Sequence, residues 1–191
     1  KSKGIPKPIF DWIEVNPSHT FSDKENGSVD IEDHGVAALT KYQFIIKASM
    51  SDFKNKKAYL FSYSGCGGFN IFLNEEDDIV FGDPCNETLQ INTSIPFPIN
   101  EKVIIWAYYD DAKMKIAVFN EKSTRPITKT FHKSLDIKNA SGIGIGRKSE
   151  GNEGFFYGYI DFVLLYPDEV PFSMIPNIIN DINNKNKAPV P

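Results

Sequence analysis

Two cysteines, Cys66 and Cys85, are spaced so that they could form a disulfide bond. They flank two apolar runs that are joined by the polar turn 74–77. If these runs pair as an antiparallel hairpin with symmetric register, Phe69 lies opposite Gly82 and the cysteines face each other at the open end. Closing a loop of about 20 residues would stabilise the fold by roughly 3 kcal/mol and would favour an extracytoplasmic compartment. The alternative is two unrelated buried thiols.

No other spacing of reactive side chains in the sequence indicates catalysis or phosphate binding. His19, His34 and His132 are dispersed and lack a Cys or His partner at metal-ligand spacing, which argues against a zinc site. No Ser-His-Asp or Cys-His arrangement has a recognisable local context. The Gly-x-Gly-x-Gly run at 142–146 begins inside an apolar segment and is not followed by a helical pattern, so it does not fit a phosphate-binding loop.

Four Asn-x-Ser/Thr sequons mark candidate sites of N-glycosylation. Four is a mild excess over chance in a chain so rich in asparagine, and it agrees with secretion. The acceptor residues are Asn26, Asn86, Asn92 and Asn139.

The composition argues against several classes of protein. The chain has 191 residues, a net charge of -4 and 41% hydrophobic residues, so it can bury one sizeable core and is not disordered as a whole. Lys and Arg number 21 against 25 Asp and Glu, so there is no basic excess to neutralise a nucleic acid. No apolar run is long enough to span a membrane, and the polar start of the sequence does not resemble a signal peptide. We expect an extracellular or cell-surface protein whose signal has been removed, or an internal fragment of one.

Strand-like patterns dominate the sequence. Residues 42–50 largely alternate between apolar and polar, as expected of a half-buried strand with one wet face. About nine to twelve short strands are separated by turn signals roughly every 8 to 12 residues, a spacing that leaves no room for helical crossovers. The aromatic content of 13% suits such pleated surfaces. We therefore expect an all-β fold, a two-sheet antiparallel β-sandwich of the jelly-roll type, with at most one or two short helices.

One short helix is expected near residues 171–182, where isoleucine and methionine recur with a partial helical spacing. The polar residues 183–191 are typical of a solvated C-terminal linker. Since the sequence has no internal repeat, we expect a single domain over residues 1–182, followed by this linker, within a larger protein.

Three segments between about Val36 and Pro176 resemble the laminin-G-like members of the concanavalin A-like lectin/glucanase superfamily. Residues 106–120 are similar to the family's Trp-led strand, acidic turn and returning strand, and residues 142–147 to its apolar strand that ends in Gly-Arg. Residues 156–166 are the most specific match, with Phe-x-Gly-x-Ile-Asp followed by Val and Tyr. The resemblance implies a concanavalin A-like sandwich in which an N-terminal strand often returns beside the last strand.

The resemblance implies recognition rather than catalysis. Glucanase members carry catalytic carboxylates as Glu-x-Asp-x-(x)-Glu on one strand, and this sequence has no such run. Retaining chemistry needs two carboxyl groups held about 5 Å apart by rigid strands. We expect a non-catalytic recognition or adhesion module that binds a protein or a glycan at the cell surface. A glycan-active hydrolase of the same superfamily and a structural spacer are the alternatives.

Calcium is the cofactor that the resemblance leaves open, since many related domains bind it at the sandwich rim through Asp, Asn and carbonyl oxygens. Solvated turns are the alternative interpretation. If residues 89–94 form a loop, the acidic turns at 77–78 and 110–111 lie at the same end of the sandwich and could share an ion. If these residues cross the sheet as a strand, the turns lie at opposite ends and cannot. The candidate ligands are Asp77, Asp78, Asp110, Asp111, Glu150, Asn152 and Glu153.

Several aromatic residues in loop-like contexts could contact a sugar or a protein if they gather on one surface. Trp106 is instead expected in the core, and Asp161 is expected to accept hydrogen bonds from neighbouring loop amides. The candidate contact residues are Tyr63, Phe69, Phe155 and Tyr157.

Overall fold

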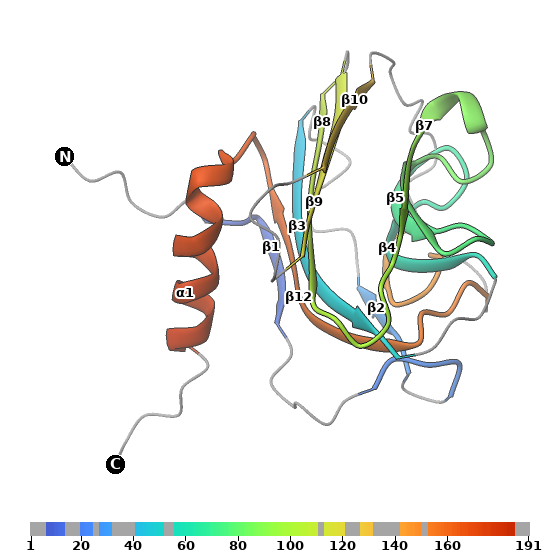
Figure 1. Ribbon diagram of the computed structural model, residues 1–191, viewed down its shortest axis with the longest axis horizontal. Helices are drawn as coiled ribbons and strands as arrows, with labels where there is room; N and C mark the ends of the chain where they lie inside the picture. Colours follow the sequence, from blue (N-terminus) through green and yellow to red (C-terminus); the bar gives the residue numbers. More distant parts are fainter. Residues whose placement is uncertain are drawn as a thin grey trace.

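The computed structural model describes residues 7–13, 20–24, 27–31, 41–51, 56–110, 113–120, 127–131, 142–149 and 153–185. Within these ranges the strands form two six-stranded sheets, and neighbouring strands of each sheet are antiparallel. The sheets lie face to face, with one helix outside them (Figure 1). The expected jelly-roll β-sandwich is confirmed.

The strand order in each sheet follows the jelly-roll path. Sheet A has the order β1 (Phe10–Ile13), β12 (Gly158–Tyr166), β3 (Tyr42–Met50), β8 (Val103–Asp110), β9 (Lys113–Asn120) and β10 (Ile127–Phe131). Sheet B has the order β2 (Val29–Ile31), β11 (Ile143–Ile145), β4 (Ala58–Tyr63), β5 (Phe69–Leu73), β6 (Asp78–Gly82) and β7 (Gln90–Pro96).

The N-terminal strand β1 pairs with the closing strand β12, from Phe10 opposite Leu165 to Ile13 opposite Phe162. This is the return that the resemblance implied. Two 3-10 turns, η2 (Glu87–Leu89) and η3 (Phe172–Met174), and the helix α1 (Ile175–Lys185) complete the described elements.

Aromatic rings fill the space between the two sheets. Phe44 of sheet A lies 4.7 Å from Phe61 and 5.2 Å from Phe69 of sheet B, measured between ring centres, and all three are fully buried. Alternate residues of β3, β5 and β8 point into this layer, as the period of two requires. Burial of so many large apolar side chains is the main source of stability in such a sandwich.

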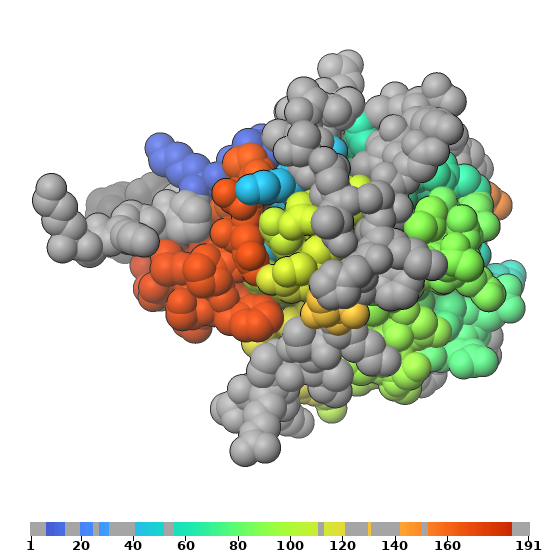
Figure 2. Space-filling view, turned by 90° about the horizontal axis from the view of Figure 1, so that it is seen from above, coloured from blue at the N-terminus to red at the C-terminus, as the bar shows by residue number. Residues whose placement is uncertain are grey.

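The outer face of sheet A carries a second apolar cluster, which α1 covers. Ile178 and Ile182 of the helix pack against sheet residues that include Trp106, and the Trp106 indole Nε1 donates a hydrogen bond of 2.7 Å to the carbonyl oxygen of Val170. Figures 1 and 2 show α1 and β7 on opposite sides of the molecule. Trp106 is therefore a core residue, as expected.

This second cluster corrects one expectation about β3. Its residues were expected to have a wet face, but eight of the nine are buried and only Lys47 is partly exposed. The outward side chain of Ile45 is covered because it belongs to the cluster beneath α1. The helix also continues to Lys185, so the segment expected as a linker from residue 183 begins inside it; residues 186–191 lie outside the described part.

The β5–β6 hairpin has a different register from the symmetric one expected. Asn70, not Phe69, lies opposite Gly82, and Leu73 lies opposite Ile79. Five residues therefore separate the last pair, and Asp77 among them adopts a left-handed conformation with φ 62°. That conformation closes the asymmetric turn, because a residue with positive φ reverses the chain more tightly than an extended one.

β7 lies at one edge of sheet B, where β6 is its neighbour in the sheet. An edge position accommodates Pro96 at the end of β7, because proline has no N–H group to donate to a neighbouring strand. Among the described residues, no helix is both long and apolar enough to cross a membrane.

Candidate functional site

The outer face of sheet B differs from that of sheet A, because a polar cleft lies on it rather than a helix. The cleft has a volume of about 570 Å³. Its lining comes from the approach to β4, from β5 and the turn after it, from the segment between β6 and β7, and from β7 itself. The lining residues are Lys57, Phe72, Asn74, Glu75, Glu76, Pro84, Glu87, Gln90 and Asn92.

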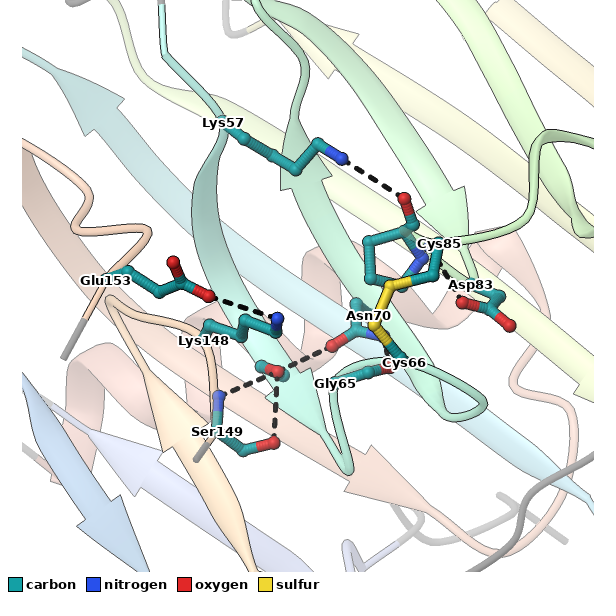
Figure 3. Close-up of polar contacts among 11 residues, drawn as sticks. Lys57, Gly65, Cys66, Asn70, Asp83, Cys85, Lys148, Ser149 and Glu153 are labelled. Atoms are coloured by element: carbon teal, nitrogen blue, oxygen red, sulfur yellow. Dashed lines mark hydrogen bonds and ion pairs between the residues drawn. A yellow bond between two sulfur atoms is a disulfide. The ribbon is translucent and has the colours of Figure 1, made fainter. Parts of the chain in front are cut away.

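Phe72, which lines the cleft, belongs to a small apolar cluster on the outer face of sheet B. Tyr59, Phe72 and Val80 pack together, and the rings of Tyr59 and Phe72 stack with centres 5.4 Å apart. The Lys57 ammonium lies 5.8 Å from the centre of the Phe72 ring and donates a hydrogen bond of 3.1 Å to the carbonyl oxygen of Pro84 (Figure 3). Lys57 thus links the start of β4 to the segment that follows β6.

Two polar side chains of the lining are held in fixed orientations. The Asn74 Oδ1 accepts hydrogen bonds from the backbone N–H groups of Glu76 and Asp78, at 2.9 and 3.0 Å. The Gln90 Nε2 donates to the carbonyl oxygen of Asp83 at 2.7 Å. Fixed polar groups lose little conformational entropy when a ligand binds.

The Cys66–Cys85 disulfide is present and ties together two turns beside the cleft, with the Cα atoms 5.3 Å apart. The bond joins the β4–β5 turn to the segment that follows β6, and this segment supplies Pro84 and Glu87 to the cleft. Both cysteines are exposed to solvent, and the Cys85 N–H donates to the Asp83 Oδ1 at 2.9 Å. The expected pairing is confirmed, and the bond lies in turns rather than at facing strand positions.

A buried polar network lies beneath these turns (Figure 3). The Ser62 hydroxyl donates to the Asn70 Oδ1 at 2.5 Å and accepts a bond of 2.9 Å from the Ser149 N–H. The Asn70 Nδ2 donates to the carbonyl oxygens of Gly65 and Gly82, at 2.9 and 3.2 Å. Fully bonded buried networks rigidify their surroundings, so this network holds the turns beside the cleft in a fixed position.

Two acidic side chains lie close enough to the Tyr59 hydroxyl to affect its ionisation. Burial is the main cause that raises the pKa of the Tyr59 hydroxyl well above its ordinary value, and the carboxylates of Glu153 and Asp83 raise it further. Tyr59 therefore stays protonated and neutral.

Among the described residues, the two acidic turns proposed to hold calcium lie far apart. β7 crosses the sheet as a strand, and the Phe97 N–H donates to the Asp77 carbonyl oxygen at 2.9 Å. β8 then runs away from this end to Asp110, about 26 Å along the strand for eight residues. The turns at Asp77 and Asp110 accordingly lie at opposite ends of the sandwich.

The described candidate ligands also have surroundings of their own within the protein. Asp77 and Asp78 are buried, Asp110 accepts a hydrogen bond of 3.0 Å from the Tyr108 hydroxyl, and Glu153 pairs with Lys148 at 3.1 Å. Among the described residues, no three His, Cys, Asp or Glu side chains are grouped to hold a metal ion. The remaining candidates lie outside the described residues: Asp111, Glu150 and Asn152.

The candidate aromatic contact surface needs a correction. Tyr63 and Phe69 are fully buried in the core and stack on each other at 4.9 Å, because both point between the sheets. Phe155 and Tyr157 are half-buried before β12. The four rings therefore do not form one exposed surface.

Asp161 also differs from expectation. It lies at a bulge in β12, where the Lys102 Nζ donates to its Oδ1 at 2.5 Å and the Lys47 ammonium lies 3.9 Å from its Oδ2. Its observed partners are thus lysine side chains rather than loop amides.

The two described sequon asparagines lie near the cleft. Asn86 caps η2, where its Oδ1 accepts bonds from the Thr88 N–H and hydroxyl at 3.0 and 2.7 Å. Asn92 is exposed and lines the cleft. Asn26 and Asn139 lie outside the described residues.

The cleft itself was not predicted from the sequence. Lys57, Phe72 and Gln90 come from separate segments of the chain. The one available signal was the alternation in β5, which places Phe72 on the opposite face from Ile71 and Leu73.

Solved structures with the same fold include carbohydrate-related proteins. The NanB sialidase from Streptococcus pneumoniae matches with a TM-score of 0.60 and 16% identity, over 90% of this chain and 28% of the sialidase chain. A botulinum neurotoxin type C structure, described as interacting with two ganglioside molecules for cell entry, matches with a TM-score of 0.62 and 14% identity, over 91% of this chain and 46% of the toxin chain.

A third match is the SAP-like pentraxin from Limulus polyphemus, with a TM-score of 0.52 and 13% identity, over 80% of this chain and 76% of the pentraxin. No protein-family model matches the sequence, and no curated protein matches it significantly. The similarities place the chain in the concanavalin-like jelly-roll fold. The chain spans less than half of the sialidase and toxin chains.

Proposed function

We propose that this chain is a non-catalytic extracellular module that recognises a glycan through the cleft on the outer face of sheet B. The carrying observation is the cleft itself, in which amide and carboxylate side chains surround a volume of about 570 Å³. Ligand clefts typically measure about 300–1,000 Å³ and use a few fixed polar groups to orient the ligand. Sugar hydroxyls can donate to the carboxylates and both donate to and accept from the amides.

The rigidity of the walls supports recognition. The disulfide, the Asn74 turn bonds and the Asn70 network hold the lining before any ligand arrives. A pre-formed site avoids the entropy cost of ordering loops on binding. The ganglioside interaction described for the botulinum neurotoxin is a precedent for a glycan partner on this fold.

A non-catalytic role is supported by the location of the cleft carboxylates. Glu75 and Glu76 lie on an exposed turn, and Glu87 lies on an exposed 3-10 turn. Glycoside hydrolysis needs a rigid pair of carboxyl groups flanking the scissile bond.

The solvent-exposed disulfide supports an extracytoplasmic location, because such bonds persist in oxidising compartments. The Phe-x-Gly-x-Ile-Asp segment that leads into β12 supports the finer, laminin-G-like assignment.

The test is binding to an array of glycans by the whole chain and by a variant with the cleft blocked. Asn92→Trp places a large side chain in the cleft, and Asn177→Trp makes the same change on the exposed side of α1. We expect the wild-type chain and Asn177→Trp to bind the same sugars and Asn92→Trp to lose at least tenfold in affinity. Equal binding by both variants would place recognition elsewhere, and release of free sugar by the wild-type chain would favour the hydrolase alternative.

A further inference from the structure

The charges that line the cleft limit which sugars it can take. Three carboxylates, those of Glu75, Glu76 and Glu87, face one ammonium group, that of Lys57, so the lining carries a net charge of -2. All four side chains are exposed, so the three carboxylates present their charge to an incoming ligand.

The single cation is already engaged. The Lys57 Nζ donates to the Pro84 carbonyl oxygen at 3.1 Å and lies over the Phe72 ring, 5.8 Å from its centre. A ligand anion would have to compete with both contacts and would still meet the three carboxylates. The Asn74 and Gln90 amides carry no charge, so they cannot offset this field.

We propose that the cleft selects neutral oligosaccharides and rejects sugars that carry a carboxylate, such as sialic acid or a uronic acid. This inference rests on the proposed function and names its ligand class. The hydroxyl groups of a neutral sugar donate to the carboxylates in charge-assisted hydrogen bonds, which are stronger than those between neutral groups. An ionised sugar carboxylate has no proton to donate and is repelled.

The size of the discrimination follows from Coulomb's law. At a separation of about 7 Å in water, each excess like charge weakens binding roughly threefold, so two give about a tenfold preference for the neutral sugar. Since these charges are exposed, salt should screen the repulsion. The preference should therefore shrink at about 1 M salt, where the Debye length is about 3 Å.

The experiment compares matched pairs on one array: neutral oligosaccharides, such as galactose-terminated N-glycans, and the same glycans capped with sialic acid. We expect the neutral member of a pair to bind about tenfold more tightly, with a smaller ratio at high salt. The double variant Glu76→Gln/Glu87→Gln leaves the lining with no net charge, so it should bring the ratio close to one. Neutral binding should weaken as well, because charge-assisted hydrogen bonds to these two carboxylates are lost. The matched control Asp23→Asn/Asp168→Asn removes two exposed carboxylates outside the cleft and should leave the ratio unchanged.

The outcomes separate this inference from the proposed function. Equal or tighter binding of the sialylated members would overturn charge selection while glycan recognition stands. A ratio that both double variants change equally would assign the effect to the overall charge of the protein and overturn the role of the cleft. No binding of any sugar would overturn the proposed function, and charge selection with it.

Discussion

Removal of the Cys66–Cys85 bond should destabilise the chain without changing its native fold. The bond closes a loop with a sequence separation of 19 residues. In the chain-entropy model, this restricts the unfolded chain by about 3 kcal/mol at 25 °C. The native turns have other support, because the Asn70 Nδ2 donates to both Gly65 and Gly82. The loss of stability should therefore arise mainly because the unfolded chain, once free of the bond, gains conformational entropy.

Urea unfolding, followed by circular dichroism, measures the effect. With an m-value of about 2 kcal/mol/M, the double variant Cys66→Ala/Cys85→Ala should unfold at about 1.5 M less urea than the oxidised chain. Because both cysteines are exposed, a thiol reductant should produce a similar shift in the wild-type protein. The same reductant should leave the double variant unchanged, which controls for unrelated effects.

Two results would refute this reasoning. A midpoint shift below about 0.3 M would mean that the bond restricts the unfolded chain far less than loop closure requires. Loss of the native spectrum without urea would mean that the bond holds the native turns directly, so the Asn70 hydrogen bonds are insufficient.

Three further predictions concern packing and pH. Ile178→Ala should cost about 2–4 kcal/mol of unfolding free energy by urea titration, because Ile178 is 2% exposed on the face of α1 that packs against sheet A, whereas the exposed Asn177→Ala should change it by less than about 0.5 kcal/mol. Gly158→Ala should lower the melting temperature, because a Cβ atom there would overlap the carbonyl oxygen of Ser49; an unchanged melting temperature would contradict that close approach. Burial, with smaller effects of nearby acidic side chains, raises the pKa of Tyr166 to about 12, so the unfolded chain releases this proton near pH 10 while the folded chain retains it. Stability should therefore be insensitive to this group below pH 10 and fall as pH rises from 10 toward 12, and Tyr166→Phe should reduce the fall in urea midpoints.

The fold could be predicted from the sequence because strand alternation is a local signal. The same signal also contained the correct hairpin register. Directly paired residues share one face of a sheet, and Phe69 and Phe81 both point into the core, so Phe69 should not pair with Gly82, the neighbour of Phe81. Matching the inward Ile71 with the inward Phe81 gives the observed pairing. The disulfide prediction was confirmed despite the wrong register, since both cysteines lie in turns beyond the ladder.

The cleft could not be predicted, because tertiary structure creates it. The segment after β6 lies across the outer face of sheet B, so that Pro84 comes within hydrogen-bonding distance of Lys57, 27 residues earlier in the chain. The buried second face of β3 has a similar cause, since α1 follows it by more than 120 residues and covers it. Neither contact leaves a pattern within one strand.

The unequal covering of the two sheets has a consequence for how this protein can evolve or be engineered. On sheet A, outward residues such as Trp106 are part of an apolar core, so changing them costs stability. On sheet B, Glu75, Glu87 and Asn92 are exposed at the cleft and belong to none of the apolar clusters. Surface substitutions of this kind usually alter stability by less than about 0.5 kcal/mol. Ligand preference at the cleft can therefore diversify while the scaffold stays constant.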